Sequence, residues 1–542
     1  PTMTDLAKTS KPLSVVAKLC YGFGGVGYDV LWIVFGAYTS IFLVDVAQMP
    51  PLFATSIIFG SRVVDILCNV VMGPLIDRTS TRWGKTKPWI VVSTLFMTLT
   101  NALIWYVPDV GTNGRLAWYI ILYTVMVLAW SGFAIAYRAI LMFLSDDSSE
   151  RDSVIMYRAM FNVVGAVVGT AMHGQILASY RRSEHDPCDN VTYSANSSTN
   201  SSEGEPSLEM TRTGYMISSA TLCCLLMLSL TAIVFGTTER KATSGGERGQ
   251  NILRTAMTVL SFRPNMYFLL AYFFIQVPLS IGHGSIALYV QYSLDLEDQI
   301  ENVFLVFMAS SAIAVPIIGW VVSKLGKRIS YVCFELAAIP VYIGFQFIPN
   351  GSFSVYAVTV GVGFTSTLAQ LVIPWLMISD IIEDCYLQTG ERLDTPFIAI
   401  FLSTNSLAIT VGLITATVGL EIGGYKLGSC TQPDMVGSAL RILVSTCTSV
   451  LAFLGVVFAW RYPITEERQK EIVEAINKRK LSTKSQPDDI QRNGSLSNMN
   501  GKALLPEETS TSSRPEGLKE EDKLLSSELD LSVLLDCRES EV

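Results

Sequence analysis

Residues 61–90 read SRVVDILCNVVMGPLIDRTSTRWGKTKPWI and contain the end of one apolar segment, a basic loop and the start of a second apolar segment. Residues 319–332, GWVVSKLGKRISYV, repeat that order. Short loops rich in Lys and Arg between long apolar segments are typical of the cytoplasmic side of membrane proteins. The stretch therefore predicts a pair of membrane helices that occurs twice in the chain.

The whole composition agrees with a membrane protein. Of the 542 residues, 50% are hydrophobic and only 16% are charged, whereas soluble domains carry about 25% charged residues. Twelve segments approach the roughly 20 apolar residues that cross a bilayer as a helix. We therefore predict an all-α polytopic membrane protein with spans at 20–46, 52–76, 88–107, 117–144, 157–180, 213–236, 265–292, 303–323, 329–348, 354–379, 397–420 and 437–460.

The loops predict the orientation of these spans. Lys and Arg gather in 77–87, 238–263 and 324–328, so these loops and the N-terminus are expected in the cytoplasm, and no cleavable signal peptide is visible. The opposite loop, 181–212, contains three Asn-x-Ser/Thr sequons, which only the lumenal side can glycosylate. Those expected glycosylation sites are Asn190, Asn196 and Asn200.

The two halves of the chain resemble each other. FLSDDSSERDSVIMYR at 143–158 and MISDIIEDCYLQTGERLDTPF at 377–397 both place Ser-Asp at a helix exit and Glu-Arg before the next span. Such repeats place a substrate site near the midplane, between the halves. We expect a cytoplasmic N-terminus (1–19), a six-helix bundle (20–237), a cytoplasmic linker (238–263), a second six-helix bundle (264–460) and a cytoplasmic tail (461–542).

Charged residues inside the spans indicate function, because each costs about 2.5–3.5 kcal/mol near a helix centre. They normally face a cavity or a partner, and here they are Asp29, Arg62, Asp65, Arg138, Arg158, His283 and Glu335. Arg62 and Asp65 share a helix face, and Asn69 extends it by one turn. This face is either a local ion pair that lets the helix insert or a cation site with oxygen ligands.

Two further intramembrane groups leave their roles open. His283 is either a proton carrier or a packing residue, and Glu335 is either a relay or lies at a misplaced span boundary.

No enzyme motif is present. The sequence has no GxxxxGK[ST] loop, no HExxH and no CxxC, and its three histidines are scattered. We therefore expect no catalytic residue, no metal centre and no cofactor. The formal net charge is −8, with much of the acid in the tail, so no nucleic-acid partner is expected either.

The remaining segments make smaller predictions. Cys188 and Cys430 fall in outside loops, where an oxidising compartment favours a disulfide. In the tail, Ile464, Ile472, Val473 and Ile476 could form one face of a short surface helix. Beyond that helix the Ser-, Asn- and Glu-rich composition predicts disorder, and the acidic dileucines at 524–525 and 534–535 fit motifs that sorting adaptors bind.

Several motifs resemble the melibiose-carrier, or sugar–cation symporter, branch of the major facilitator superfamily. They are CYGFGGVGYD at 20–29, the Arg62 and Asp65 pair, TRWGKTKPWI at 81–90 and ISDIIEDCYLQTGER at 378–392. Other motifs are similar to the animal sodium-dependent lysophosphatidylcholine symporters and their sphingosine-1-phosphate-exporting relatives, namely FLVDVAQ at 42–48, ERDSVIMYR at 150–158, GTAMHGQIL at 169–177, IPWLMISD at 373–380, GGYKLGSCTQP at 423–433 and YPITEER at 462–468.

The resemblance implies a major facilitator fold, a Cys188–Cys430 disulfide and glycosylation of the loop after span 5. It also implies that Arg158, Pro374 and Trp375 line the headgroup and cavity region.

The chain departs from this family at several positions. Asn69 stands where the family has a second Asp, and Asn405 where it has a Lys, so one anion and one cation are lost together. His283 replaces an acid of the lipid symporters, and Arg138 follows Ala136-Tyr137 where they have Pro-Tyr. Asp29 falls where the sugar carriers have a substrate-binding acid.

We expect a secondary transporter that moves a lysophospholipid or similar amphiphile by alternating access. The alternatives are a transporter of a polar solute such as a sugar, with cation or proton coupling, and a non-transporting receptor or scaffold. The coupling ion is open between Na⁺ and H⁺, and weak or absent sodium dependence is expected because one carboxylate is missing. The plasma membrane is the expected location, with endolysosomal and endoplasmic reticulum membranes as alternatives.

These expectations assign residues to two sites. Asp65 and Asn69 are the predicted cation site. The predicted substrate site consists of Asp29, Arg138, Arg158, His283, Pro374, Trp375 and Asn405.

Overall fold

The computed structural model describes residues 13–145, 147–180, 204–239, 252–296, 299–390, 392–425, 432–476 and 478. Within them, regular structure is helical apart from one isolated bridge between Thr81 and Gly84. Twelve helices or joined helices in this part of the chain are long and apolar enough to cross a membrane. This confirms the predicted all-α fold with twelve spans.

The first six spans come from seven helices. The chain enters through α2 (Val15–Gly24) and α3 (Val26–Ile41), which together make span 1 and lead into the π-helical turn η2 (Phe42–Val46). The following five spans are α4 (Pro51–Arg78), α5 (Lys87–Ile104), α6 (Thr112–Leu144), α7 (Ser148–Tyr180) and α8 (Gly204–Gly236).

The second six spans follow the short helix α9 (Ile252–Ser261). Four are single helices, α10 (Arg263–Tyr292), α11 (Ile300–Leu325), α12 (Lys327–Gly344) and α15 (Asp394–Ile422), with the 3-10 turn η5 (Phe345–Phe347) after α12. The other two are broken by π-helical turns: α13 (Ser354–Val362), η6 (Gly363–Thr367) and α14 (Leu368–Thr389), then α16 (Asp434–Ile442), η7 (Leu443–Cys447) and α17 (Thr448–Trp460).

Local sequence explains where several spans begin. Proline stands in the first turn of α4, α5 and α10, where its missing N–H leaves no hydrogen bond unmade. Within these helices most side chains are apolar, because a bilayer offers no partners for polar groups.

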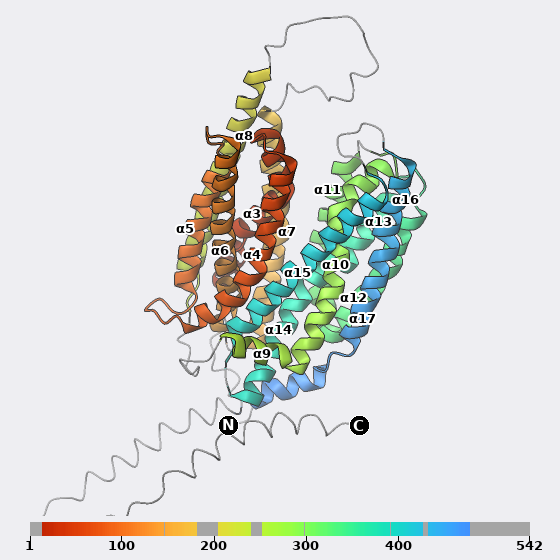
Figure 1. Cartoon of the computed structure of the whole chain (residues 1–542). Coiled ribbons are helices and arrows are strands. Elements are labelled where there is room, and N and C mark those ends of the chain that lie inside the picture. The colour runs from red at the N-terminus through yellow and green to blue at the C-terminus, as the bar shows by residue number, and fades with distance from the viewer. Residues whose placement is uncertain are drawn as a thin grey trace, which may run out of the picture. The chain divides into compact units, whose positions relative to one another are not determined.

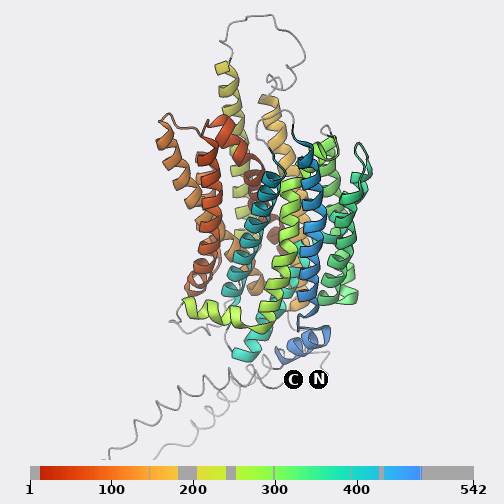
Figure 2. The same cartoon turned by 45° about the vertical axis from the view of Figure 1, so that its right-hand side comes forward.

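The helices form two bundles that stand side by side, as both ribbon views show (Figures 1 and 2). α4 and α6 of the first bundle touch α15 of the second, and α7 touches α11 and α14. The contact is close: a Cβ added to Gly73 of α4 would lie 2.5 Å from the Cβ of Ala399 of α15. Small residues therefore allow the bundles to meet backbone to backbone.

Charged side chains join the bundles at the end where α9 lies. Arg151 of α7 is hydrogen-bonded and ion-paired to Glu383 of α14. The Nζ atom of Lys327 lies 3.2 Å from Asp152 of the first bundle and 2.9 Å from Asp380 of the second. We call this group, Arg151, Asp152, Lys327, Asp380 and Glu383, the closed end.

The tail helix at 466–476 lies against the closed end. Arg468 is paired with Asp384 of α14 at 3.1 Å, and Gln469 donates a hydrogen bond to Asp380. Ile464, Ile472 and Ile476 are buried, and Val473 is half-buried. The predicted short helix is thus present with Ile472, Val473 and Ile476, whereas Ile464 lies two residues before its start.

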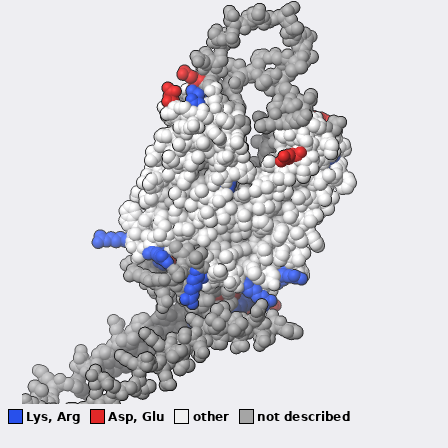
Figure 3. Space-filling model, viewed as in Figure 1, with Lys and Arg blue, Asp and Glu red and all other residues white. Residues whose placement is uncertain are grey.

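The outer surface fits a membrane. In the space-filling view the flank of the molecule is nearly free of charge, and Lys and Arg collect towards the end that carries the basic loops (Figure 3). The same view shows a recess between the two bundles at the opposite end.

Candidate functional site

Asp65 is the centre of a polar cluster that spans both bundles. Its Oδ1 accepts hydrogen bonds from the Ser131 hydroxyl of α6 at 3.0 Å and from the Asn69 amide at 3.3 Å. Its Oδ2 accepts a hydrogen bond of 2.5 Å from the Ser406 hydroxyl of α15. We call Asp65, Asn69, Ser131 and Ser406 the Asp65 cluster. One carboxylate and several neutral oxygens are ligands that a small hard cation accepts.

Arg62 does not pair with Asp65 in the described part of the chain. Its guanidinium carbon instead lies 4.7 Å from the ring centroid of Trp32, a cation–π contact. Arg62 and Asp65 still interact electrostatically, at a distance longer than a salt bridge, and the atoms hydrogen-bonded to the Asp65 carboxylate belong to hydroxyl and amide groups.

Asp29 and Arg158 form a buried ion pair within the first bundle. The Asp29 Oδ1 lies 3.5 Å from a guanidinium nitrogen of Arg158, and the two side chains are about 10% and 7% exposed. The Arg158 guanidinium also lies over the ring of Tyr137 at 5.4 Å. The acid that resembles the sugar-carrier residue thus has a basic partner on α7.

Arg138 and Trp375 meet across the two bundles. The Arg138 guanidinium carbon lies 4.7 Å from the ring centroid of Trp375 and 5.5 Å from that of Tyr28. Arg158 lies over the same Trp375 ring at 6.0 Å. Two cations of the first bundle therefore converge on one indole of the second, which α14 presents just after Pro374.

The aromatic residues around this point are stacked. Tyr28 and Phe133 have ring centroids 5.1 Å apart, and Phe133 and Tyr137 5.4 Å. Phe401 of α15 meets Trp375 edge to face at 4.7 Å. We call the region of Arg138, Arg158, Trp375, Tyr28 and Phe401 the central site.

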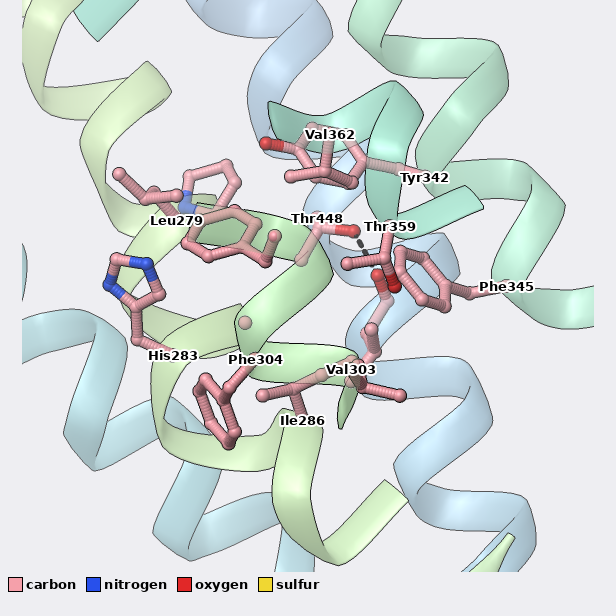
Figure 4. Close-up of a pocket in the computed structure, with 14 residues that line it drawn as sticks. Leu279, His283, Ile286, Val303, Phe304, Tyr342, Phe345, Thr359, Val362 and Thr448 are labelled. Carbon is pink, nitrogen blue, oxygen red and sulfur yellow. Dashed lines mark hydrogen bonds between the residues drawn. The ribbon is translucent and has the colours of Figure 1, made fainter. Parts of the chain in front are cut away.

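Asn405 borders the central site through Tyr272, whose ring packs against Phe401 at 4.6 Å, whereas His283 lies elsewhere in the second bundle. The Asn405 Oδ1 accepts a hydrogen bond of 2.8 Å from the Tyr272 hydroxyl, and the next residue, Ser406, belongs to the Asp65 cluster. His283 faces an apolar pocket inside the second bundle (Figure 4). The structure thus gathers Asp29, Arg138, Arg158 and Trp375, places Asn405 next to the Asp65 cluster and separates His283 from both.

Sequence reasoning missed Ser131, Ser406 and Tyr272. Serine and tyrosine are common in membrane helices, so their presence carried no signal. Only the fold shows that Ser131 and Ser406 face Asp65 from 66 and 341 residues away along the chain.

Other predicted features lie outside the described residues. They are Cys188 and Cys430, the sequons at Asn190, Asn196 and Asn200, and the tail dileucines.

Two bundles of six spans with buried charge at their contact define a polytopic membrane transporter of the major facilitator type. The family described as "MFS/sugar transport protein" matches residues 20–466. The chain belongs to this family and is a transporter, not an enzyme.

Named relatives cover nearly the whole chain. The sodium-dependent lysophosphatidylcholine symporter 1-B of Danio rerio is 31% identical over 91% of this chain and 96% of its own length. The human sodium-dependent lysophosphatidylcholine symporter 1 is 29% identical over 86% and 89%. The sphingosine-1-phosphate transporter MFSD2B of Xenopus tropicalis is 28% identical over 87% and 92%.

Solved structures agree on the fold. A crystal structure of the fucose:proton symporter FucP of E. coli superposes with a TM-score of 0.56, at 14% identity, over 83% of this chain and 98% of FucP. Another, of FucP in the outward conformation, gives a TM-score of 0.58 over the same shares.

Proposed function

We propose that this protein transports a lysophospholipid, or a related single-chain lipid with a phosphate headgroup, by alternating access. The observation that carries the proposal is Arg138. The residue is half-buried at the contact of the two bundles, its guanidinium donates one hydrogen bond to the Ala134 carbonyl of its own helix, and it forms no ion pair among the described residues. A charge inside a membrane span normally has a counter-ion, and a phosphate supplies one with bidentate geometry.

The surroundings of Arg138 suit a headgroup with a tail. Arg158 is already neutralised by Asp29, so one net positive charge faces the central site. The rings of Tyr28, Trp375 and Phe401 offer apolar surface next to that charge. Such a mixture fits an anionic amphiphile better than a neutral sugar, which needs many hydrogen-bond partners. The named relatives act on lysophosphatidylcholine or sphingosine-1-phosphate, and both molecules carry a phosphate and one long chain.

The contacts between the bundles supply a mechanism for alternating access. The closed end holds the bundles together on the predicted cytoplasmic side, and the Ser406–Asp65 hydrogen bond joins them at the middle of α4, while a recess separates them on the other side (Figure 3). Opening towards the cytoplasm requires that these ion pairs and this hydrogen bond break. Arg138 and Trp375 stand on opposite bundles, so this movement also changes the headgroup site.

Coupling to an ion is part of the proposal. We expect little or no sodium dependence, because the Asp65 cluster contains one carboxylate, whose oxygens already accept three hydrogen bonds. We expect the plasma membrane as the site of transport, with sorting adaptors bound to the tail dileucines.

A substrate panel tests the proposal. Cells that express the protein are given labelled lysophosphatidylcholine, labelled sphingosine-1-phosphate, a monoacylglycerol with the same tail and a labelled hexose, each in sodium and sodium-free buffer. We expect accumulation of one or both phosphate lipids and no accumulation of the monoacylglycerol. Uptake of the hexose alone would overturn the proposal, as would the absence of any transport at normal surface expression.

A further inference from the structure

The second bundle holds an acid that the proposed transport does not use. Glu335 of α12 is fully buried, and neither of its carboxyl oxygens has a hydrogen-bond partner that meets normal geometry. Among the described residues it forms no ion pair. An ionised carboxylate in such a place would cost several kcal/mol, so the group holds its proton in this conformation.

The residues near Glu335 are polar but uncharged. Tyr331, one turn earlier on α12, is fully buried and has a hydroxyl without a partner. Gln370 of α14 lies beside the carboxyl and donates a hydrogen bond of 3.0 Å to the Ile275 carbonyl. Tyr272 of α10 lies within electrostatic reach of Tyr331 and donates to Asn405, the neighbour of Ser406.

These groups connect the acid to the contact between the bundles. Tyr331 lies within electrostatic reach of both Glu335 and Tyr272, and Tyr272 is hydrogen-bonded to Asn405, which precedes Ser406 of the Asp65 cluster in the chain. A proton that leaves Glu335 therefore has the polar side chains of Tyr331 and Gln370 close by.

No charge stabilises the ionised form of Glu335 in this conformation. The titratable groups that face it are Tyr331 from its own helix and, beyond that residue, Tyr272 from α10. From the other described elements packed on α12, namely α11, α13, η6, α14, η7 and α17, no Lys, Arg, His, Asp or Glu side chain acts on it electrostatically. Asp380 of α14 is bound to Lys327 at the closed end. Release of the proton thus requires a rearrangement that admits water or a cation.

The packing next to Glu335 offers a place for such a rearrangement. The π-helical turn η6 contacts α12 and directly precedes the segment that carries Gln370. A Cβ on Gly363, the first residue of η6, would lie 2.1 Å from the Ser310 hydroxyl of α11, so α11 also packs tightly there. π-helical turns inside membrane helices frequently mark functional sites because their register can change.

We propose that Glu335 is a proton-binding site that loads and unloads once per transport cycle, which couples lysolipid transport to protons. In this step the carboxyl O–H bond breaks, the proton passes to water that enters along the polar side chains, and a carboxylate remains until the next proton binds. This inference rests on the proposed transport of a phosphate lipid.

The test measures the uptake of labelled lysophosphatidylcholine, without sodium, from about pH 5 to about pH 8, a range wide enough to detect the titration of one buried carboxyl group. We expect the wild-type rate to depend on pH by up to about tenfold per pH unit, the limit for one proton. In Glu335→Gln, which keeps the shape but binds no proton, we expect a flat profile together with retained exchange of labelled for unlabelled lipid.

Two variants separate the outcomes. Glu335→Asp keeps an acid and should keep the dependence on pH. His283→Gln removes another titratable group of the same bundle and, whatever its rate, should keep the wild-type profile. A flat wild-type profile overturns the inference, and so does a Glu335→Gln protein that transports with the wild-type profile. If the wild type moves no lysolipid at any pH, the proposed substrate is wrong instead.

Discussion

Arg138 lies beside Trp375 at the contact of the two bundles and has no carboxylate partner among the described residues, and its role is testable by substitution. Arg138→Gln removes the charge-assisted hydrogen bonds to a phosphate, each worth about 1.5–3 kcal/mol, so we expect the apparent KM for lysophosphatidylcholine to rise about 10- to 100-fold. Arg138→Lys keeps the charge but loses the contact of the planar guanidinium with Trp375. We expect its apparent KM to lie between that of the wild type and that of Arg138→Gln. Concentration series of uptake at matched surface expression measure both.

A contrasting arginine provides the control for that prediction. Arg115 donates a hydrogen bond to the Ala47 carbonyl, away from the central site. Arg115→Gln should leave the KM nearly unchanged. If it weakens lysolipid uptake as much as Arg138→Gln does, a specific contact between Arg138 and the phosphate is excluded.

Asn69 and Asn405 are the residues at which we expect substitutions to change the response to sodium. The Asn69 amide nitrogen lies 3.3 Å from the Asp65 carboxylate, so Asn69→Asp places a second carboxylate at about that distance. Asn405→Lys adds a cation next to Ser406 in the chain. We expect the double variant to show uptake that rises with sodium, because paired carboxylates favour a bound cation. The measurement is lysolipid uptake as a function of sodium concentration in the wild type, both single variants and the double variant. Steep sodium dependence in the wild type would contradict the expectation.

At the scale of elements, α7 and α14 are tied by the closed end. Arg151→Gln leaves Glu383 buried without its partner, and breaking a buried ion pair costs about 3–5 kcal/mol. We therefore expect α7 and α14 to separate more often. Cys385 of α14, two residues after Glu383, is buried, so its reaction with a membrane-permeant maleimide should become at least about tenfold faster.

Two further variants check this interpretation. The exchanged pair, Arg151→Glu with Glu383→Arg, should restore slow labelling of Cys385. Arg468→Gln breaks an ion pair in which the arginine is 45% exposed, and exposed pairs contribute little, so labelling should stay close to the wild-type rate. Equal labelling of Arg151→Gln and wild type would show that the ion pair does not hold the two helices together.

The same elements show how far the sequence predicts the structure. Long apolar segments predicted all twelve spans, since hydropathy alone decides membrane insertion. The spacing of Asp65 and Asn69 predicted their contact, because residues four apart meet on a helix. Ser131, Ser406 and the Arg62–Trp32 contact could not be predicted, because partners on different helices depend on helix rotation. The π-helical turns η2, η6 and η7 leave no clear signal in the hydropathy pattern either.

At the scale of the whole molecule, the contact of α4 with α15 requires a small side chain. A Cβ on Gly73 would approach Ala399 and the Thr395 carbonyl at 2.5 and 3.0 Å. Gly73→Val should therefore prevent close contact of the bundles, favour the state in which this end is open, and lower lysolipid uptake severely. The Cys385 labelling assay should show faster reaction in this variant.

The matched control lies on the same helix. Gly60 of α4 has nothing within 4 Å of an added Cβ, so Gly60→Val changes helix propensity in the same way without a clash. It should transport at nearly the wild-type rate. Similar losses in both variants would attribute the effect to the helix itself rather than to contact between the bundles.

The hydrogen bond from Ser406 to Asp65 has a consequence for the return step of the cycle. A carrier without cargo must still reorient, and a bare carboxylate buried between the bundles would oppose this. The serine hydroxyl takes the position that an ion would otherwise occupy and so lowers the energy of the unloaded carrier. We therefore expect net accumulation as well as one-for-one exchange, because the protein is able to reset while empty.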